Sequence, residues 1–198
     1  MLLYHGSSRD GLQTLQPSVA DHGKPYVYFS TSEIAACFYA ANAVPRPHYW
    51  FPYGYDAAGK VIYTETYPNA FRDVYEGRQG YLYACEIPED ALLRFPSNPH
   101  LRISAEPVAV ARTETIGDLC EWFLRRENEG KLIIQRYETL APAVLSAWHS
   151  MVLEDLRAAA ANAKDSAYSD FVRSRMPAVW ERFTRQPEYD CSYTGPII

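Results

Sequence analysis

One histidine stands where it could bind the hydroxyl group of a ligand. His5 ends an expected strand and is followed at once by Gly6. Because glycine has no Cβ, a ligand can approach the backbone closely there, and the neighbouring N–H and C=O groups become available to an amide. Either ring nitrogen of His5 can form a hydrogen bond with a sugar hydroxyl. The alternative is that His5 is a structural residue whose hydrogen bonds are satisfied within the fold.

Three aromatic residues could hold a flat ring. Tyr28 lies on an expected strand directly ahead of a helix, and Phe38 and Tyr39 follow on that helix. Two aromatic rings brought together across this turn can sandwich a planar group, with stacking and burial each contributing on the order of 1 kcal/mol. The spacing does not choose between Phe38 and Tyr39. The same rings could instead pack the strand against the helix.

A carboxylate is the third group that such a site needs, since a carboxylate beside a sugar stabilises positive charge that develops on it. Glu106, ahead of an expected strand, is the candidate, and Glu65, Glu86 and Glu114 are its rivals. Glu106 could also be an exposed carboxylate at the start of a strand.

The hydrophobic pattern predicts the elements that carry these residues. β-Branched and aromatic runs indicate strands, and Thr31 and Ser32 supply hydroxyls suited to capping the alanine-rich helix that follows. Prolines and glycines indicate a loop before the third strand. The expected strands are 2–6, 25–30, 61–66, 80–87 and 108–111, the helix is 34–41, and the loop is 44–60.

The second part of the chain is expected to be helical. Apolar residues recur at helical spacing over 116–126, over 132–161 with a break at Pro142, and over 168–183 with a kink or a restart at Pro177. The chain is therefore divided into an α+β domain over 1–114 and a helical extension over 115–198, packed on the same core.

Aromatic residues crowd the middle of the first part. Packing is the simpler interpretation, because tyrosine can bury its ring while its hydroxyl stays in water. The other is a binding surface for a flat or sugar-like ligand, or for a protein. The crowded residues are Tyr49, Trp50, Phe51, Tyr53, Tyr55, Tyr63, Tyr67, Phe71 and Tyr75.

These motifs, in this order, resemble a known family. The segments Leu3-Tyr4-His5-Gly6-Ser7, Val27-Tyr28-Phe29-Ser30 and Ala36-Cys37-Phe38-Tyr39 resemble ADP-ribosyltransferases of the diphtheria-toxin and poly(ADP-ribose) polymerase type, which carry a His-Tyr-Glu triad. The later segments are similar to the small bacterial rifampin ADP-ribosyltransferases. They are Gly80-Tyr81-Leu82-Tyr83-Ala84-Cys85-Glu86-Ile87-Pro88, Pro96-Ser97-Asn98-Pro99 and Arg102-Ile103-Ser104-Ala105-Glu106-Pro107-Val108.

The resemblance covers residues 2–112 and implies a split, mixed or antiparallel β-sheet core. It leaves the helical C-terminal extension, which the hydrophobic pattern predicts, unmatched. It also implies NAD as a substrate, with no metal, and cleavage of the bond between nicotinamide and ribose. His5, Tyr28 and Glu106 would be the catalytic set, with Glu106 in the place where the polymerase group has its glutamate. NAD would be held by His5, Gly6, Ser7, Tyr28, Ser30 and either Phe38 or Tyr39.

Two other functions remain open. RNA 2'-phosphotransferases share the fold and the His-Gly strand, but they need arginines that converge on phosphates. Arg9, Arg46, Arg72, Arg78 and Arg102 are available, yet the acidic charge balance argues against RNA. The second is a non-catalytic module of the same fold that binds a nucleotide or a protein.

Composition limits the remaining classes. The formal charge is -5, which gives no overall attraction for nucleic acid. The four cysteines show no zinc-binding spacing, and no run is long enough to span a membrane. We therefore expect a cytoplasmic protein whose partners are NAD and an unidentified acceptor of ADP-ribose, a protein side chain being one candidate.

Overall fold

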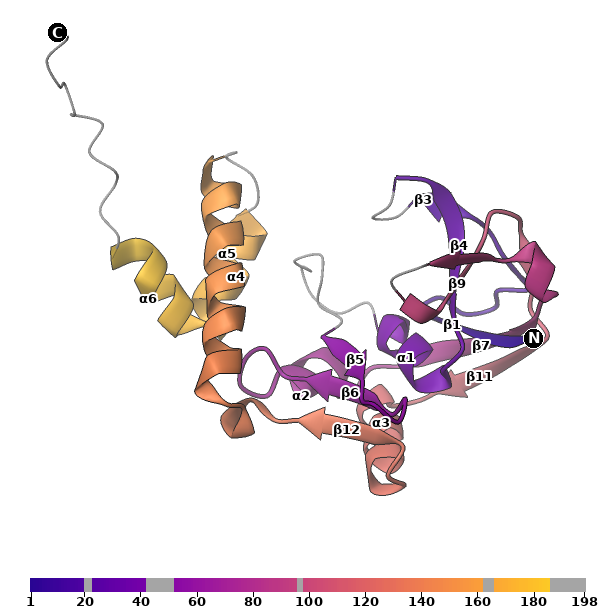
Figure 1. Ribbon diagram of the computed structural model, residues 1–198, viewed down its shortest axis with the longest axis horizontal. Coiled ribbons are helices and arrows are strands. Elements are labelled where there is room, and N and C mark those ends of the chain that lie inside the picture. Colours follow the sequence, from indigo (N-terminus) through magenta and orange to yellow (C-terminus); the bar gives the residue numbers. More distant parts are fainter. Residues whose placement is uncertain (20–22, 42–51, 96–97, 162–165, 186–198) are drawn as a thin grey trace, which may run out of the picture.

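The computed structural model describes residues 1–19, 23–41, 52–95, 98–161 and 166–185. It is an α+β protein whose largest sheet is antiparallel and lies at one end of the molecule, while the C-terminal helices lie at the other (Figure 1). The expected fold class is confirmed at the level of α+β with antiparallel sheets.

The main sheet has the strand order β11-β7-β1-β4-β9-β8, with β3 alongside β4. Every pair in it is antiparallel. The strands are β1 (Leu2–Ser7), β3 (Ser18–Val19), β4 (Pro25–Ser30), β7 (Gly80–Glu86), β8 (Leu93–Phe95), β9 (Asn98–Ser104) and β11 (Arg112–Ile116).

The two sides of β1 are paired very differently. On one side, β1 pairs with β7 along its whole length, from Leu2 opposite Glu86 to Ser7 opposite Tyr81. On the other side, its register with β4 consists of Tyr4 opposite Ser30. Continuing that register would put Gly6 opposite Tyr28, but the described strands do not pair there. The sheet is therefore open between the end of β1 and the start of β4.

Helix α1 (Glu33–Cys37) and the following turn η1 (Phe38–Ala40) cover one face of the sheet. Ser32 caps α1, because its hydroxyl oxygen accepts a hydrogen bond from the Ala35 N–H. The chain therefore turns directly from β4 into the helix, as the hydroxyl-rich sequence predicts. Close approach to β1 requires Gly6: a Cβ added there would lie 2.0 Å from the Ala36 carbonyl oxygen.

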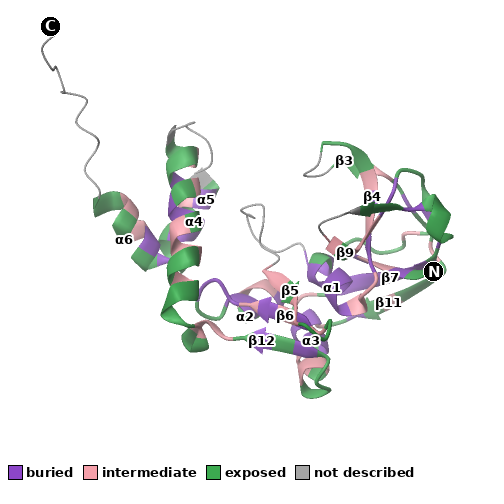
Figure 2. Ribbon diagram, viewed as in Figure 1, coloured by how far each residue is buried: buried purple, intermediate pink, exposed green. Residues whose placement is uncertain are grey.

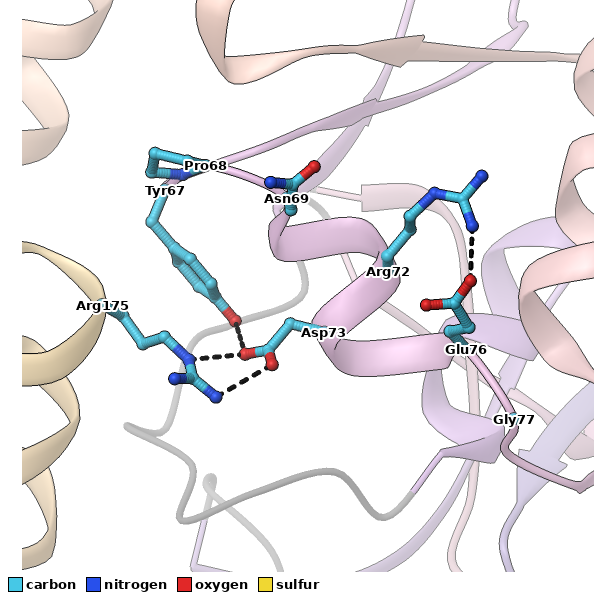
Figure 3. A pocket seen from close by; sticks show the side chains of 8 residues that line it. All are labelled: Tyr67, Pro68, Asn69, Arg72, Asp73, Glu76, Gly77 and Arg175. Carbon is cyan, nitrogen blue, oxygen red and sulfur yellow. Dashed lines mark hydrogen bonds and ion pairs between the residues drawn. The ribbon is translucent and has the colours of Figure 1, made fainter.

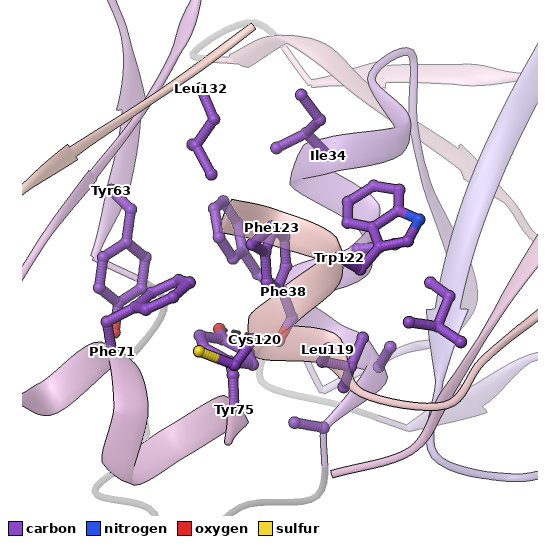
Figure 4. Close-up of a cluster of buried hydrophobic side chains, with 14 of the residues drawn as sticks. Ile34, Phe38, Tyr63, Phe71, Tyr75, Leu119, Cys120, Trp122, Phe123 and Leu132 are labelled. Atoms are coloured by element: carbon purple, nitrogen blue, oxygen red, sulfur yellow. Dashed lines mark hydrogen bonds between the residues drawn. The ribbon is translucent and has the colours of Figure 1, made fainter. Parts of the chain in front are cut away.

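An aromatic core lies between α1 and a second, three-stranded sheet (Figure 4). Phe38 stacks on Phe123 with ring centroids 4.8 Å apart. The Tyr75 hydroxyl is buried and donates a hydrogen bond to the Phe38 carbonyl, so its polar group is satisfied within the core. The elements around this core are α2 (Ala70–Tyr75), α3 (Leu119–Asn128), β5 (Tyr53–Tyr55), β6 (Val61–Thr64) and β12 (Leu132–Gln135).

Two segments differ from the expected secondary structure. Residues 132–135 form a strand, parallel to β6, and not the start of a helix. Their burial alternates between buried and exposed, which is the period of a strand. Residues 53–55 form β5 within the expected loop, antiparallel to β6.

The opposite face of the main sheet packs on a separate cluster built from Leu3, Val27, Phe29, Tyr83 and neighbouring residues. It is closed by the short ladder of β2 (Thr14–Leu15) with β10 (Val108–Ala109). The short turns η2 (Glu89–Ala91) and η3 (Tyr137–Thr139) lie in the connections before β8 and before α4.

The C-terminal helices form a third cluster (Figure 2). They are α4 (Pro142–Ala161), α5 (Ser166–Arg175) and α6 (Pro177–Arg185), and both prolines stand first in their helices, where the missing N–H costs no hydrogen bond. Only Tyr67 and Ala70 of this cluster come from the preceding part of the chain. Because β11 crosses residue 114 and α3 packs in the aromatic core, the helical extension starts at α4 and not at residue 115.

We expect Gly6→Ala to lower the free energy of unfolding by about 3 kcal/mol or more, because the added methyl group would force α1 away from β1. Gly117→Ala is the matched control. No atom lies within 4 Å of a Cβ added at Gly117, so its stability should stay within about 1 kcal/mol of the parent chain. Urea denaturation of both variants measures the difference, and equal stabilities would contradict the role assigned to Gly6.

Candidate functional site

His5 spans the opening between β1 and β4. Its Nδ1 lies 2.9 Å from the Tyr28 carbonyl oxygen. Since a carbonyl oxygen only accepts, Nδ1 carries the proton, and in the neutral ring Nε2 is left as an acceptor. Burial lowers the pKa of His5, while the hydrogen bond to Tyr28 opposes this shift. A neutral imidazole that can accept a hydrogen bond from a hydroxyl group is therefore held at the opening.

Gly6 presents its peptide groups to the same opening. The amino group and the carbonyl of Met1 both form hydrogen bonds with Ile87, on the side of β7. Because the direction of the peptide groups alternates along a strand, those of Leu3, His5 and Ser7 also point toward β7. The N–H and C=O of Gly6 consequently point to the side where β4 would lie. The position of its missing Cβ is occupied by the Ala36 carbonyl. On the face of the sheet that α1 covers, it is therefore α1, and not a ligand, that approaches the Gly6 backbone closely.

Tyr28 and His5 come together through the backbone of Tyr28, and not through their rings. Alternation along β4 places Tyr28 on the face of α1, opposite to Phe29. The His5 ring meets Phe29 edge-on, with centroids 6.2 Å apart, and the Tyr28 ring meets Tyr26 edge-on at 6.3 Å. A ligand in contact with both side chains must therefore lie within the opening.

The two serines of the predicted NAD-binding set have local partners. The Ser7 hydroxyl oxygen accepts a hydrogen bond from the Arg9 N–H at 3.1 Å. The Ser30 hydroxyl oxygen accepts one from the Ser32 N–H at 3.0 Å and is also hydrogen-bonded to Tyr55. Ser30 thus ties the end of β4 both to the start of α1 and to β5.

The structure distinguishes Phe38 from Tyr39. The Phe38 side chain is 0% exposed and is packed inside the aromatic core, whereas Tyr39 is 43% exposed. The turn η1 points consecutive side chains in different directions, so one ring enters the core and the next faces solvent. Tyr39 is therefore the ring that a ligand can reach, and its hydroxyl lies 3.4 Å from that of Tyr53.

A row of aromatic rings continues from Tyr39, and the sequence analysis did not assign it to the site. Tyr39 meets Tyr53 edge-on at 6.2 Å, Tyr53 meets Tyr55 in the same way at 6.2 Å, and Tyr55 stacks on His100 at 3.8 Å. The available signal was the crowding of aromatics in 49–75. Tyr49, Trp50 and Phe51 lie outside the described residues.

Glu106 lies farther along the sheet. It is exposed in the connection after β9, where its N–H donates to the Ser104 hydroxyl and its carbonyl accepts from it. Ile103 is opposite Tyr28, so Glu106 is three residues farther along the chain, in the bend after β9 ends at Ser104. Among the described residues, its carboxylate makes no hydrogen bond to His5 or Tyr28.

The rival carboxylates have other positions. Glu65 is 3% exposed and accepts from the N–H groups of Phe71 and Tyr137, so it fixes the start of α2 and the segment after β12. Glu114 accepts a hydrogen bond from the Trp122 indole at 3.0 Å. Glu86 is exposed at the end of β7.

A pocket of about 610 Å³ lies apart from this opening, between α2 and α5 (Figure 3). Two of its charged groups are joined across it: Arg175 of α5 donates two hydrogen bonds to the Asp73 carboxylate, at 2.8 and 2.9 Å. The Tyr67 hydroxyl donates to the same carboxylate. Because Arg72 is paired with Glu76 as well, the charges of this pocket are balanced internally, and it ties the C-terminal helices to the domain.

Comparisons of the chain with protein-family models, with curated proteins and with solved structures returned no match. Within the described residues, none of the helices combines the length and apolar character that crossing a membrane requires.

We expect the stability of the protein to fall as the pH drops from about 7 to 5, in part because of His5. Burial lowers its pKa below 6.5, so the unfolded chain binds more protons in this range. The stabilisation is complete above pH 6.5 and is lost as the pH falls toward the folded-state pKa. The pKa of His149 is lowered too, by burial and by Arg182, so both histidines contribute.

Urea unfolding of the parent chain, His5→Gln and His149→Gln across this pH range measures each share. Each variant should show a shallower decline than the parent chain. A decline in His5→Gln as steep as that of the parent chain would contradict a buried neutral His5.

Proposed function

We propose that the protein is an NAD-dependent ADP-ribosyltransferase or NAD glycohydrolase, a transferase of the glycosyltransferase class. The observation that supports this most is the opening between β1 and β4, where a neutral His5 reaches the Tyr28 carbonyl. The peptide groups of Gly6 face the same opening. An amide, a flat ring and a ribose hydroxyl joined in one molecule match these groups, and the nicotinamide riboside half of NAD combines all three.

In this proposal each group has one task. The N–H and C=O of Gly6 bind the carboxamide, because their orientation leaves them directed away from β7. The exposed ring of Tyr39 stacks on the nicotinamide. Nε2 of His5 accepts a hydrogen bond from a ribose hydroxyl, and this requires the neutral ring that burial favours.

The reaction breaks the bond between C1' of the ribose and the nicotinamide nitrogen. The electron pair of that bond leaves with the nicotinamide, which becomes neutral, and positive charge develops on the ribose. Glu106 would stabilise this charge from the end of β9. An acceptor oxygen then bonds to C1' and loses its proton; when the acceptor is water, the products are ADP-ribose and nicotinamide.

A non-catalytic module that binds a nucleotide or a protein is the second candidate. The position of Glu106 favours it, since this exposed residue lies in the bend after β9, three residues past the one opposite Tyr28. Under this candidate, NAD binds but nicotinamide is not released.

The positions and partners of the arginines give less support to an RNA 2'-phosphotransferase. Arg72 is paired with Glu76, and Arg102 donates to the carbonyls of Pro99 and Leu101. The guanidinium groups of Arg72 and Arg102 are paired within the protein and lie on separate elements, so they do not converge on a phosphate. Arg46 lies outside the described residues.

We expect the purified protein to release nicotinamide from NAD slowly, and Glu106→Ala to abolish this release while leaving NAD affinity within about twofold. Loss of a transition-state carboxylate should slow release by about 100-fold or more. Chromatography of nicotinamide and calorimetry with NAD give the two quantities. Glu154→Ala, an exposed glutamate on α4, is the matched control and should behave like the parent chain.

Three outcomes separate the candidates. NAD binding without release by the parent chain favours the binding module, and absence of NAD binding removes both enzymes, the transferase and the phosphotransferase. Removal of a 2'-phosphate from RNA in the presence of NAD would favour the phosphotransferase instead.

We expect Tyr39→Ala to weaken NAD binding by about fivefold, which corresponds to a stacking contribution near 1 kcal/mol, and Tyr39→Phe to retain most of the affinity. Calorimetry with NAD measures both. Equal losses in the two variants would assign the effect to the hydroxyl contact with Tyr53 and not to the ring.

A further inference from the structure

A second pocket, with a volume of about 700 Å³, lies where the two sheets meet. One wall is the hairpin of β5 and β6, and the other is the start of β9. We call it the hairpin pocket and define it by Tyr53, Tyr55, Asp56, Gly59, Asn98 and His100. It is separate from the charged pocket between α2 and α5, and it adjoins the aromatic row that begins at Tyr39.

Its aromatic wall is held firmly. The rings of Tyr55 and His100 are stacked, with centroids 3.8 Å apart and planes inclined by 20°. His100 is fixed to Thr31 twice, through Nδ1 to the threonine hydroxyl at 3.1 Å and through its carbonyl, which accepts from the Thr31 N–H at 3.0 Å. Tyr55 is hydrogen-bonded to Ser30, and burial raises its pKa to about 12, so its hydroxyl stays protonated.

Polar atoms remain available around this wall. One Asp56 carboxylate oxygen accepts from the N–H groups of Ala58 and Lys60, at 2.9 and 2.8 Å, and shapes the turn. The Asn98 side-chain oxygen accepts from the His100 N–H at 3.0 Å. In the part of the chain that the structure describes, Asp56 Oδ2, Asn98 Nδ2 and His100 Nε2 make no hydrogen bond. They provide an acceptor, a donor and an imidazole nitrogen to a ligand.

The charge of the lining selects the ligand class. The described residues that line the pocket include one carboxylate and neither lysine nor arginine, so a phosphate would meet repulsion and no countercharge. Aromatic rings beside a carboxylate and an amide suit a ring with one apolar face and hydroxyl groups at its edge. We propose that the hairpin pocket binds a neutral, hydroxyl-bearing ring of the sugar class and that this ligand is the acceptor of ADP-ribose.

The acceptor role rests on the proposed function, whereas the binding of a sugar does not. The row Tyr55–Tyr53–Tyr39 leads from the pocket to the ring assigned to nicotinamide. In the transfer, a ligand hydroxyl oxygen forms a bond to C1' of the ribose as the bond from C1' to nicotinamide breaks. The electron pair leaves with nicotinamide, and the hydroxyl proton passes to Nε2 of His100 and then to water.

Saturation-transfer NMR tests the binding without NAD. The probes are methyl β-D-glucoside, methyl β-D-galactoside and methyl α-D-mannoside. Inorganic phosphate, which has no carbon-bound proton to observe, is added as a competitor that would reduce the glycoside signal if it took the site. At least one glycoside should bind, and Asn98→Asp should weaken it by at least about fivefold, because the variant keeps the oxygen that caps the His100 N–H but loses the donor. Asn128→Asp, exposed at the end of α3, is the matched control and should bind as the parent chain does.

Binding of none of the glycosides overturns the proposal, as does undiminished binding by Asn98→Asp or displacement of the bound glycoside by an equal concentration of phosphate. Incubation with NAD and the bound glycoside then tests the acceptor role, through mass spectrometry of an ADP-ribosyl glycoside. Nicotinamide release without this product overturns the acceptor role alone. If the glycoside binds but nicotinamide is never released, the proposed function fails together with the acceptor role, and the sugar site stands.

Discussion

The interaction on which the candidate site depends is the contact of α1 with β1 at Gly6. The chain leaves β4 at Ser30, is capped at Ser32 and crosses β1 so closely that the Ala36 carbonyl occupies the place of a side chain. The ladder between β1 and β4 is reduced to Tyr4 opposite Ser30. Tyr28, which a continued ladder would place opposite Gly6, gives its carbonyl to His5 instead. The missing side chain of Gly6 and the imidazole of His5 thus account for an open strand pair in which the Tyr28 carbonyl still has a hydrogen-bond partner.

This arrangement gives the aromatic residues different tasks. Phe38, Phe71, Tyr75 and Phe123 form a core that joins α1 to α2 and α3 and connects the two sheets. Tyr39 is exposed, and Tyr53 and Tyr55 are half-buried at the edge of this core, where the hydroxyls bond to one another or to Ser30. Burial raises the pKa of Tyr53, so its hydroxyl remains a neutral hydrogen-bonding group. Packing in the core therefore applies to some members of this aromatic stretch, while others remain partly exposed, as the proposed ligand contact requires.

The acidic residues also differ in whether their carboxylates have a structural partner. Glu65 is buried because two backbone N–H groups satisfy its carboxylate, and Asp73 holds Arg175 across the junction with the C-terminal helices. That ion pair is partly exposed, so it contributes little by itself; the apolar packing of Tyr67 and Ala70 against α4 to α6 carries most of the attachment. Glu106 is exposed, and among the described residues its carboxylate has no such structural partner.

The sequence by itself determined the α+β class, the strands β1, β4 and β7, the capped helix after β4, and interruptions of the C-terminal helical pattern at Pro142 and Pro177, because these follow from local periodicity, capping and proline geometry. It also identified His5, Gly6 and Tyr28 as neighbours in a possible site. Only the tertiary structure decided that Phe38 enters the core while Tyr39 does not, that 132–135 is a strand, and that Tyr55 meets His100. Each of these depends on partners distant in the chain: Phe123 accepts the Phe38 ring, β6 supplies the ladder for β12, and β9 brings His100 to the β5–β6 hairpin. Local pattern contains no information about such partners, so the residues that surround the site could be named in advance but not assigned to the core or to the opening.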